Sequence, residues 1–87
     1  MKYKIYDMMK EDGSFFVIEA KDDYDFVDNV HRRTRYQWFG ENIHEMLQRL
    51  WKDYDMPIEC TVNWASFKRW ILESGRGEEY GDKQEET

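Results

Sequence analysis

The chain has 87 residues, a formal net charge of −6 at pH 7 and an aromatic content of 17%. A chain of this length supports one domain with a small core. Its mild excess of acids argues against a wide phosphate-binding surface, because phosphate contacts require clustered cations, and it favours a basic partner. The single Cys60, the lack of an apolar N-terminal stretch and the lack of a long apolar run predict a soluble, cytoplasmic protein with no membrane partner.

Residues 2–21 are predicted to form a β-hairpin, because Asp12-Gly13 separates two β-prone runs and suits a two-residue type I′ turn. That loop would place three opposed pairs on one face of the sheet: Ile5 with Ala20, Asp7 with Ile18, and Met9 with Phe16. The other face would carry Tyr6, Met8, Phe15 and Val17. Both faces are partly apolar, so either both are covered or one meets a partner. Tyr6 and Phe15 are therefore candidate partner-binding residues.

Residues 22–33 predict a short helix, followed by an extended segment at 35–39. Asp22 or Asp23 can cap the helix, acids occupy its first turn, and His31, Arg32 and Arg33 occupy its last turn. Its inner face would carry Phe26, Val27, Val30 and Thr34. A strand from about residue 30 to 39 is the alternative, because that run is rich in β-prone residues.

Residues 42–54 give the strongest helical pattern, with Asn42 and Glu45 spaced for a capping box. The apolar stripe consists of Ile43, Met46, Leu47, Leu50, Trp51 and Tyr54. Pro57 ends this helix, and residues 58–62 are predicted to form a short strand. A final helix is predicted after the cap Asn63, with Trp64, Phe67 and Ile71 inside and Gly75 as its stop.

These elements predict an α+β fold. The N-terminal hairpin, either alone or widened to a three-stranded antiparallel sheet by residues 35–39 or 58–62, would pack against two or three α-helices. Residues 1–74 would form one compact domain. Residues 75–87 would form a disordered acidic tail that is dispensable for folding, because Tyr80 is its only large apolar residue.

The stretch HRRTRYQWFG, residues 31–40, combines three arginines with aromatic residues. In a nucleic-acid-binding module, Arg32, Arg33 and Arg35 would hold phosphates while Tyr36 or Trp38 stacked on a base. We favour the alternative, in which the arginines balance the acids upstream and Trp38 and Phe39 join the core. Direct binding of nucleic acid is therefore not expected.

The sequence predicts neither an enzyme nor a metal or cofactor site. His31, His44 and Cys60 lack the spacing of a zinc site. Cys60 follows Glu59 and has no adjacent cation, so an inert, partly buried thiol is expected. The chain contains no Gly-rich phosphate loop, nucleophile elbow or HExxH motif, so no catalytic residue is assigned.

Two further groups of residues are candidates for partner binding. The first is the acid block Asp22, Asp23, Asp25 and Asp28, which could occupy a cationic groove. The second is Trp70, which lies off the inner stripe beside Lys68 and Arg69 and belongs to a residue type that dominates interface hot spots.

In size and composition the chain resembles the small acidic proteins with which phages and mobile elements inhibit host machinery, anti-CRISPR proteins among them. The predicted function is therefore non-enzymatic: the chain would bind a basic or nucleic-acid-binding protein and block it sterically or electrostatically. A nucleic-acid-binding module using residues 31–39 is one alternative. A self-associating structural protein, forming a homodimer through the hairpin face, is the other.

Overall fold

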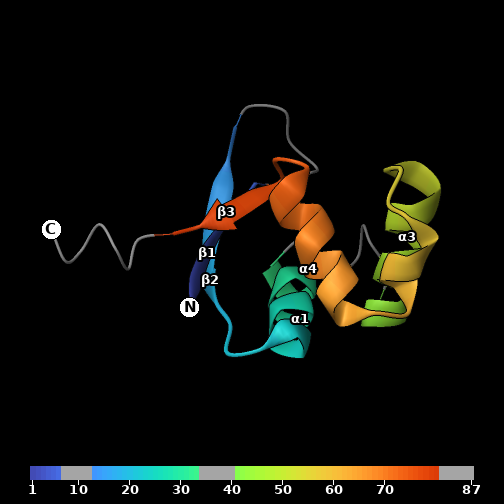
Figure 1. Ribbon diagram of the computed structural model, residues 1–87, viewed down its shortest axis with the longest axis horizontal. Helices are drawn as coiled ribbons and strands as arrows, with labels where there is room; N and C mark the ends of the chain where they lie inside the picture. The colour runs from blue at the N-terminus through green and yellow to red at the C-terminus, as the bar shows by residue number, and fades with distance from the viewer. Residues whose placement is uncertain (7–12, 34–40, 81–87) are drawn as a thin grey trace, which may run out of the picture.

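The computed structural model describes residues 1–6, 13–33 and 41–80. In chain order it contains β1 (Lys2–Tyr6), β2 (Phe15–Glu19), α1 (Asp23–Arg33), α3 (Ile43–Asp53), the 3-10 helix η1 (Ile58–Thr61), α4 (Trp64–Glu73) and β3 (Gly77–Glu79). The strands form one antiparallel sheet in the order β2-β1-β3, and the helices lie to one side of it (Figure 1). The predicted α+β fold, with a three-stranded antiparallel sheet packed against helices, is confirmed.

The hairpin register differs from the prediction. Tyr3 lies opposite Ile18 and Ile5 lies opposite Phe16, so Ile5 does not pair with Ala20. The predicted Asp12-Gly13 turn falls partly in residues 7–12, which are outside the described residues. The shift is an even number of residues, and because side chains alternate along a strand, the predicted division into two faces is retained.

The third strand comes from neither of the predicted segments. Residues 58–61 form η1, in which the Cys60 N–H donates to the Pro57 carbonyl at 3.0 Å, and residues 35–39 lie outside the described residues. The third strand is instead β3. Its pairing with β1 is flanked by bonds from the Tyr6 N–H to the Arg76 carbonyl and from the Tyr80 N–H to the Lys2 carbonyl, each 2.9 Å long.

The predicted disorder beyond residue 74 is thus wrong for residues 77–79; residues 81–87 lie outside the described part of the chain. The prediction counted apolar side chains, whereas β3 is held by main-chain hydrogen bonds to β1. Gly77 also packs closely because it has no side chain. A Cβ built there would lie 2.8 Å from Ile71 Cγ2 and 3.0 Å from Ile5 Cδ1.

All three α-helices of the described chain begin with a side-chain cap, as the sequence predicted. The cap oxygen accepts a backbone N–H three residues later: Asp22 from Asp25 at 2.8 Å, Asn42 from Glu45 at 2.9 Å, and Asn63 from Ser66 at 3.1 Å. Helix α4 ends at Glu73, and Gly75, the predicted stop, follows its cap Ser74 with a φ of +82°. There the Arg76 N–H donates to the Ile71 carbonyl at 3.1 Å, the long bond of a Schellman motif.

The core lies between the sheet and the helices. Its largest fully buried side chains are Phe26, Phe67, Ile5, Met46, Leu47, Leu50, Met56, Ile71, Val27 and Val30. The predicted inner faces are largely confirmed, but two tryptophans are exceptions: Trp51 is 37% exposed and Trp64 is 39% exposed. Within the described ranges, none of the helices has both the length and the apolar character needed to span a bilayer.

Candidate protein-binding site

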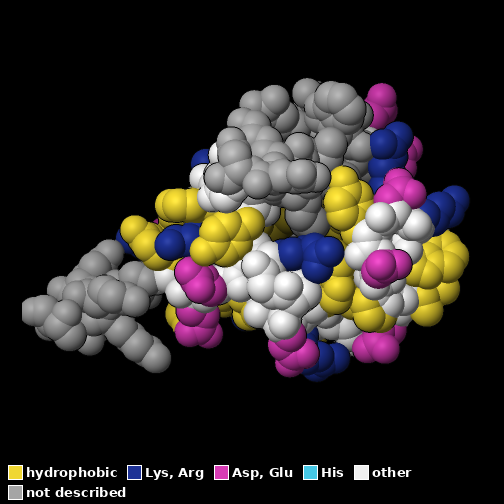
Figure 2. All heavy atoms as spheres, turned by 90° about the horizontal axis from the view of Figure 1, so that it is seen from above, with side chains coloured by type: hydrophobic (Ala, Val, Ile, Leu, Met, Phe, Trp, Pro, Cys, Tyr) yellow, Lys and Arg dark blue, Asp and Glu magenta, His cyan; other side chains and the backbone are white. Residues whose placement is uncertain are grey.

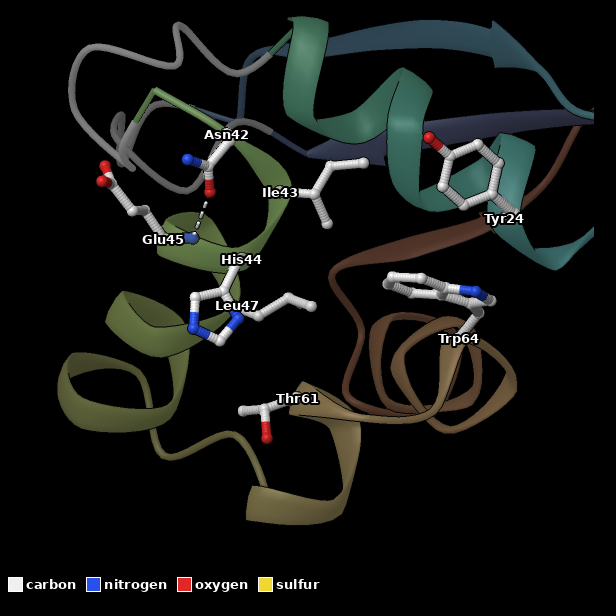
Figure 3. A pocket seen from close by; sticks show the side chains of 8 residues that line it. All are labelled: Tyr24, Asn42, Ile43, His44, Glu45, Leu47, Thr61 and Trp64. Carbon is white, nitrogen blue, oxygen red and sulfur yellow. Dashed lines mark hydrogen bonds between the residues drawn. The ribbon is translucent and has the colours of Figure 1, made fainter.

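Helices α1, α3 and α4 begin at the same end of the molecule (Figure 1). A pocket of about 540 Å³ lies at that end. The residues that line it come mainly from the first turns of the helices: Tyr24, Asn42, Ile43, His44, Glu45, Leu47, Thr61 and Trp64 (Figure 3). The caps therefore position the pocket residues, because each cap fixes where the first turn of its helix starts.

Two aromatic rings form one wall of the pocket. The centroids of Tyr24 and Trp64 are 5.4 Å apart, with an interplanar angle of 68°, an edge-to-face contact that holds both rings in place. Ile43 and Leu47 extend from α3 toward these rings (Figure 3). Tyr24 is nevertheless 51% exposed and Trp64 39% exposed. This wall can accept an apolar side chain from a partner.

The sequence predicted Trp64 inside the core and gave Tyr24 no role. The reason lies in their positions, since Trp64 is the first residue of α4 and Tyr24 the second of α1. A helical side chain points back over the turn that precedes it. In the first turn no such helical turn exists, so a large ring projects beyond the helix end. An aromatic residue directly after a predicted cap is the sequence signal that could have identified these exposed rings.

Three residues of the predicted acid block lie in or next to the first turn of α1, the helix from which Tyr24 lines the pocket. Asp22 caps that helix, and the Asp25 Oδ2 accepts the Lys21 N–H at 3.1 Å. Asp23 Oδ1 lies 3.6 Å from Lys68 Nζ. The Tyr3 hydroxyl, and with it the Asp23 carboxylate, holds the pKa of Lys68 above its ordinary value.

Asp28 is separate from this group. Its Oδ2 lies 2.8 Å from Arg32 Nη2, one helical turn further along. On α3, Glu45 Oε1 accepts the Glu41 N–H at 2.9 Å, and Figure 3 shows the Glu45 carboxylate turned away from Tyr24 and Trp64. Each of these carboxylates thus has a local structural partner, and Glu45 is the one acidic residue among the described residues that line the pocket.

The remaining predicted site residues lie elsewhere. Tyr6 and Phe15 are adjacent on the face of the sheet opposite the helices, with ring centroids 6.1 Å apart. Trp70 is half-buried: it lies 6.3 Å from the Phe67 ring, and the Arg76 guanidinium lies 4.5 Å over its face. The seven candidate residues therefore do not form one site, and Trp70 packs against Phe67 and Arg76.

Two of the three arginines in the basic-aromatic stretch make structural contacts. Arg32 pairs with Asp28 at 2.8 Å. Arg33 Nη1 donates to the Val17 carbonyl at 3.3 Å, and its guanidinium lies 5.2 Å from the Phe16 ring centroid. Arg35, Tyr36, Trp38 and Phe39 lie outside the described residues. The contacts of Arg32 and Arg33 fit the interpretation in which these arginines serve the fold.

Cys60 is buried, as expected. Burial raises the pKa of its thiol, as does the neighbouring Glu59, while Arg69 opposes them in part. A protonated, enclosed thiol is a poor nucleophile. Within residues 1–6, 13–33 and 41–80, no three histidine, cysteine, aspartate or glutamate side chains are grouped so that they could hold a metal ion.

Comparison of the chain with protein-family models, with curated proteins and with solved structures finds no match in any of the three.

Proposed function

We propose that the protein binds a basic partner protein, without catalysing a reaction, through the pocket where the helices begin. The observation that carries this proposal is the exposed edge-to-face pair of Tyr24 and Trp64. Tyrosine and tryptophan are enriched among interface residues that contribute most to binding, because they bury a large area with few rotatable bonds. Here the two rings hold each other before any partner arrives, so little side-chain entropy is lost on binding.

The charges around the pocket indicate the partner's chemistry. Asp22, Asp23 and Asp25 lie beside Tyr24 along the chain, and Glu41 and Glu45 flank the start of α3. Lys68 offsets one of these charges by pairing with Asp23. The remaining acids attract a cationic surface and increase the association rate, an effect that salt weakens.

A partner of this kind could be a protein that binds nucleic acid, because such proteins carry cationic grooves. The small acidic chain would then occupy the groove and exclude the nucleic acid, as an anti-CRISPR-like inhibitor from a phage or mobile element would. Support for this role comes from the acids at the starts of α1 and α3, the formal net charge of −6 and the small size of the chain.

The test compares three forms of the protein immobilised on a resin and exposed to bacterial lysate. These are the wild type, the Tyr24→Ala/Trp64→Ala variant, and a Trp51→Ala control in which a similarly exposed tryptophan is removed from the last turns of α3. Proteins retained by the wild type and the control but lost with the double variant are then purified and titrated by calorimetry. The proposal expects a basic protein whose affinity falls at least about tenfold, which corresponds to 1.4 kcal/mol, in the double variant.

Equal retention by all three forms would contradict the assignment of the pocket. The nucleic-acid-binding alternative would be favoured instead if fluorescence anisotropy showed salt-sensitive binding of single-stranded DNA or RNA. That binding should be abolished by replacing Arg32, Arg33 and Arg35 with glutamine.

A further inference from the structure

The face of the sheet opposite the helices forms a second aromatic surface. Side chains alternate along a strand, so the residues between the buried Tyr3, Ile5 and Ile18 point away from the core. We call this surface the open sheet face; its residues are Lys2, Lys4, Tyr6, Phe15, Val17, Glu19, Glu78 and Tyr80. Figure 2 shows hydrophobic side chains gathered around a basic one at the sheet end of the molecule. Phe15 is 51% exposed and Tyr80 41% exposed.

Lys4 organises the centre of this face. Its Nζ lies 4.6 Å from the Phe15 ring centroid and 5.6 Å from that of Tyr80. The same Nζ lies 3.6 Å from Glu78 Oε2, to which the Tyr6 hydroxyl also donates at 3.4 Å. These contacts join all three strands. The face is therefore ordered before association, which lowers the entropic cost of burying it.

The neighbouring edge of the sheet is blocked for strand pairing. The outward carbonyl of Val17 in β2 accepts from Arg33 at 3.3 Å, and that of Glu19 accepts from Asn29 at 3.3 Å. Side chains from α1 thus occupy the acceptors that an added strand would need. An association at this end of the molecule would use the face of the sheet rather than the β2 edge.

The charge of the open sheet face indicates what covers it. Lys2 and Lys4 balance Glu19 and Glu78, so this face is formally neutral and the whole net charge of −6 lies elsewhere on the chain. A strongly charged partner gains nothing from a neutral face. Two copies of this chain, by contrast, repel each other over most of their surfaces and could approach here, where each carries both signs of charge.

We propose that the open sheet face binds a second copy of the chain, forming a symmetric dimer with the two sheets face to face. In a two-fold interface the same patch is used by both subunits and must be self-complementary. The lysines of one open sheet face meet the glutamates of the other, while the aromatic rings lose their contact with water. Stacked sheets pack about 10 Å apart, close enough for such side chains to interdigitate.

The first test is sedimentation equilibrium over a range of protein concentrations. The wild type should move from the 10.8 kDa mass of one chain toward twice that value as concentration rises. Phe15→Glu, which adds a charge to the face, should raise the dissociation constant at least about tenfold, equivalent to 1.4 kcal/mol. The matched control is Val62→Glu, at a position that is 84% exposed and lies just before α4, and it should associate like the wild type.

The second test swaps charges. Lys4→Glu and Glu78→Lys should each weaken self-association, and an equimolar mixture should form a heterodimer that is tighter than either homodimer. Circular dichroism confirms that each variant is folded. A wild type that stays monomeric throughout would overturn the proposal, as would a dimer indifferent to Phe15→Glu or a mixture that does not associate.

This inference is independent of the proposed function. The Tyr24→Ala/Trp64→Ala variant should dimerise like the wild type, because the pocket and the open sheet face share no residue. Loss of the dimer in that variant would overturn the proposal, whereas loss of the partner protein alone would not affect it.

Discussion

Phe15 on the open sheet face and Tyr24 at the pocket rim are equally exposed, at 51% each, but their surroundings differ. Each makes an edge-to-face contact with a second ring, Tyr6 for Phe15 and Trp64 for Tyr24. The Lys4 ammonium, which pairs with Glu78, lies over the Phe15 ring, whereas Tyr24 lies between two aspartates along the chain. Exposure alone therefore does not define an interface. The charges near an exposed ring indicate whether the surface suits a basic protein or a second copy of the chain.

The two surfaces also differ in what holds them. The pocket consists of first turns of helices, which short-range caps position. The open sheet face depends on long-range pairing, because β1 joins β2 on one side and β3, more than seventy residues later, on the other. Substitutions can therefore damage one surface and leave the other intact.

The largest effect should come from the core that supports both surfaces. Phe67 is fully buried and contacts the Phe26 ring at 6.1 Å. Phe67→Ala should lower the free energy of unfolding by about 3–5 kcal/mol, the range for a buried large aromatic. Urea denaturation measures this, with Val62→Ala as a control expected within about 0.5 kcal/mol of the wild type. A loss below about 1 kcal/mol for Phe67→Ala would show that the helices do not pack as described.

The next largest effect should come from a substitution that disturbs the sheet, and with it the open sheet face, but not the pocket. Gly77→Ala introduces a Cβ only 2.8 Å from Ile71 Cγ2 and 3.2 Å from the Lys4 carbonyl oxygen, so β3 must shift. We expect a loss of about 1–3 kcal/mol, the usual cost of overpacking, together with weaker self-association. Glu79→Ala, on the same strand but exposed, is the control. Equal stability of the two variants in calorimetric melts would contradict the pairing of β3 with β1.

A smaller effect should be confined to the pocket. Asn42→Ala removes the acceptor of the Glu45 N–H and should cost about 1 kcal/mol, the typical value for a lost helix cap. Asn42→Asp keeps an acceptor and serves as the control. In spectra of isotope-labelled protein, the Trp64 indole resonance should move with Asn42→Ala while the amides of β1 and β2 stay in place. Movement of the strand amides instead would link the two surfaces.

The smallest effect is a dependence of stability on pH through Cys60, which belongs to neither surface. Burial raises the pKa of its thiol, so the unfolded chain releases this proton at a lower pH than the folded chain. Stability should therefore be unaffected below the ordinary thiol pKa and should decrease as the pH rises above it. The decrease measured by urea denaturation should be smaller in Cys60→Ala; an identical decrease in both proteins would exclude the thiol as a cause.

The same division explains what the sequence could predict. Caps such as Asn42 and Asn63 act over three residues, and apolar stripes such as Met46, Leu47 and Leu50 reflect the helical period. Both features can therefore be predicted from the sequence alone. The hairpin register and β3 depend on pairing between distant segments, which neither turn composition nor apolar content reveals. Gly77 illustrates this, because its role is visible only beside Ile5 and Ile71.

The candidate sites followed a similar pattern. The sequence predicts Tyr6 and Phe15 on one face of the sheet, because side chains alternate along a strand, and that placement is confirmed. Trp64 was misplaced because helical periodicity ignores where a helix begins. The sequence predicts the acid block as a binding surface, but its members also make structural contacts. Asp22 accepts the Asp25 N–H, and Asp28 pairs with Arg32.

The separation of the two surfaces is tested most directly by diluting isotope-labelled protein and recording its amide and indole resonances at each concentration. We expect the concentration-dependent shifts to be confined to the open sheet face, with the largest at Lys4, Phe15 and Glu78, while the Tyr24 amide and the Trp64 indole do not move. Shifts centred on Tyr24 and Trp64, or a spectrum independent of concentration, would contradict this expectation.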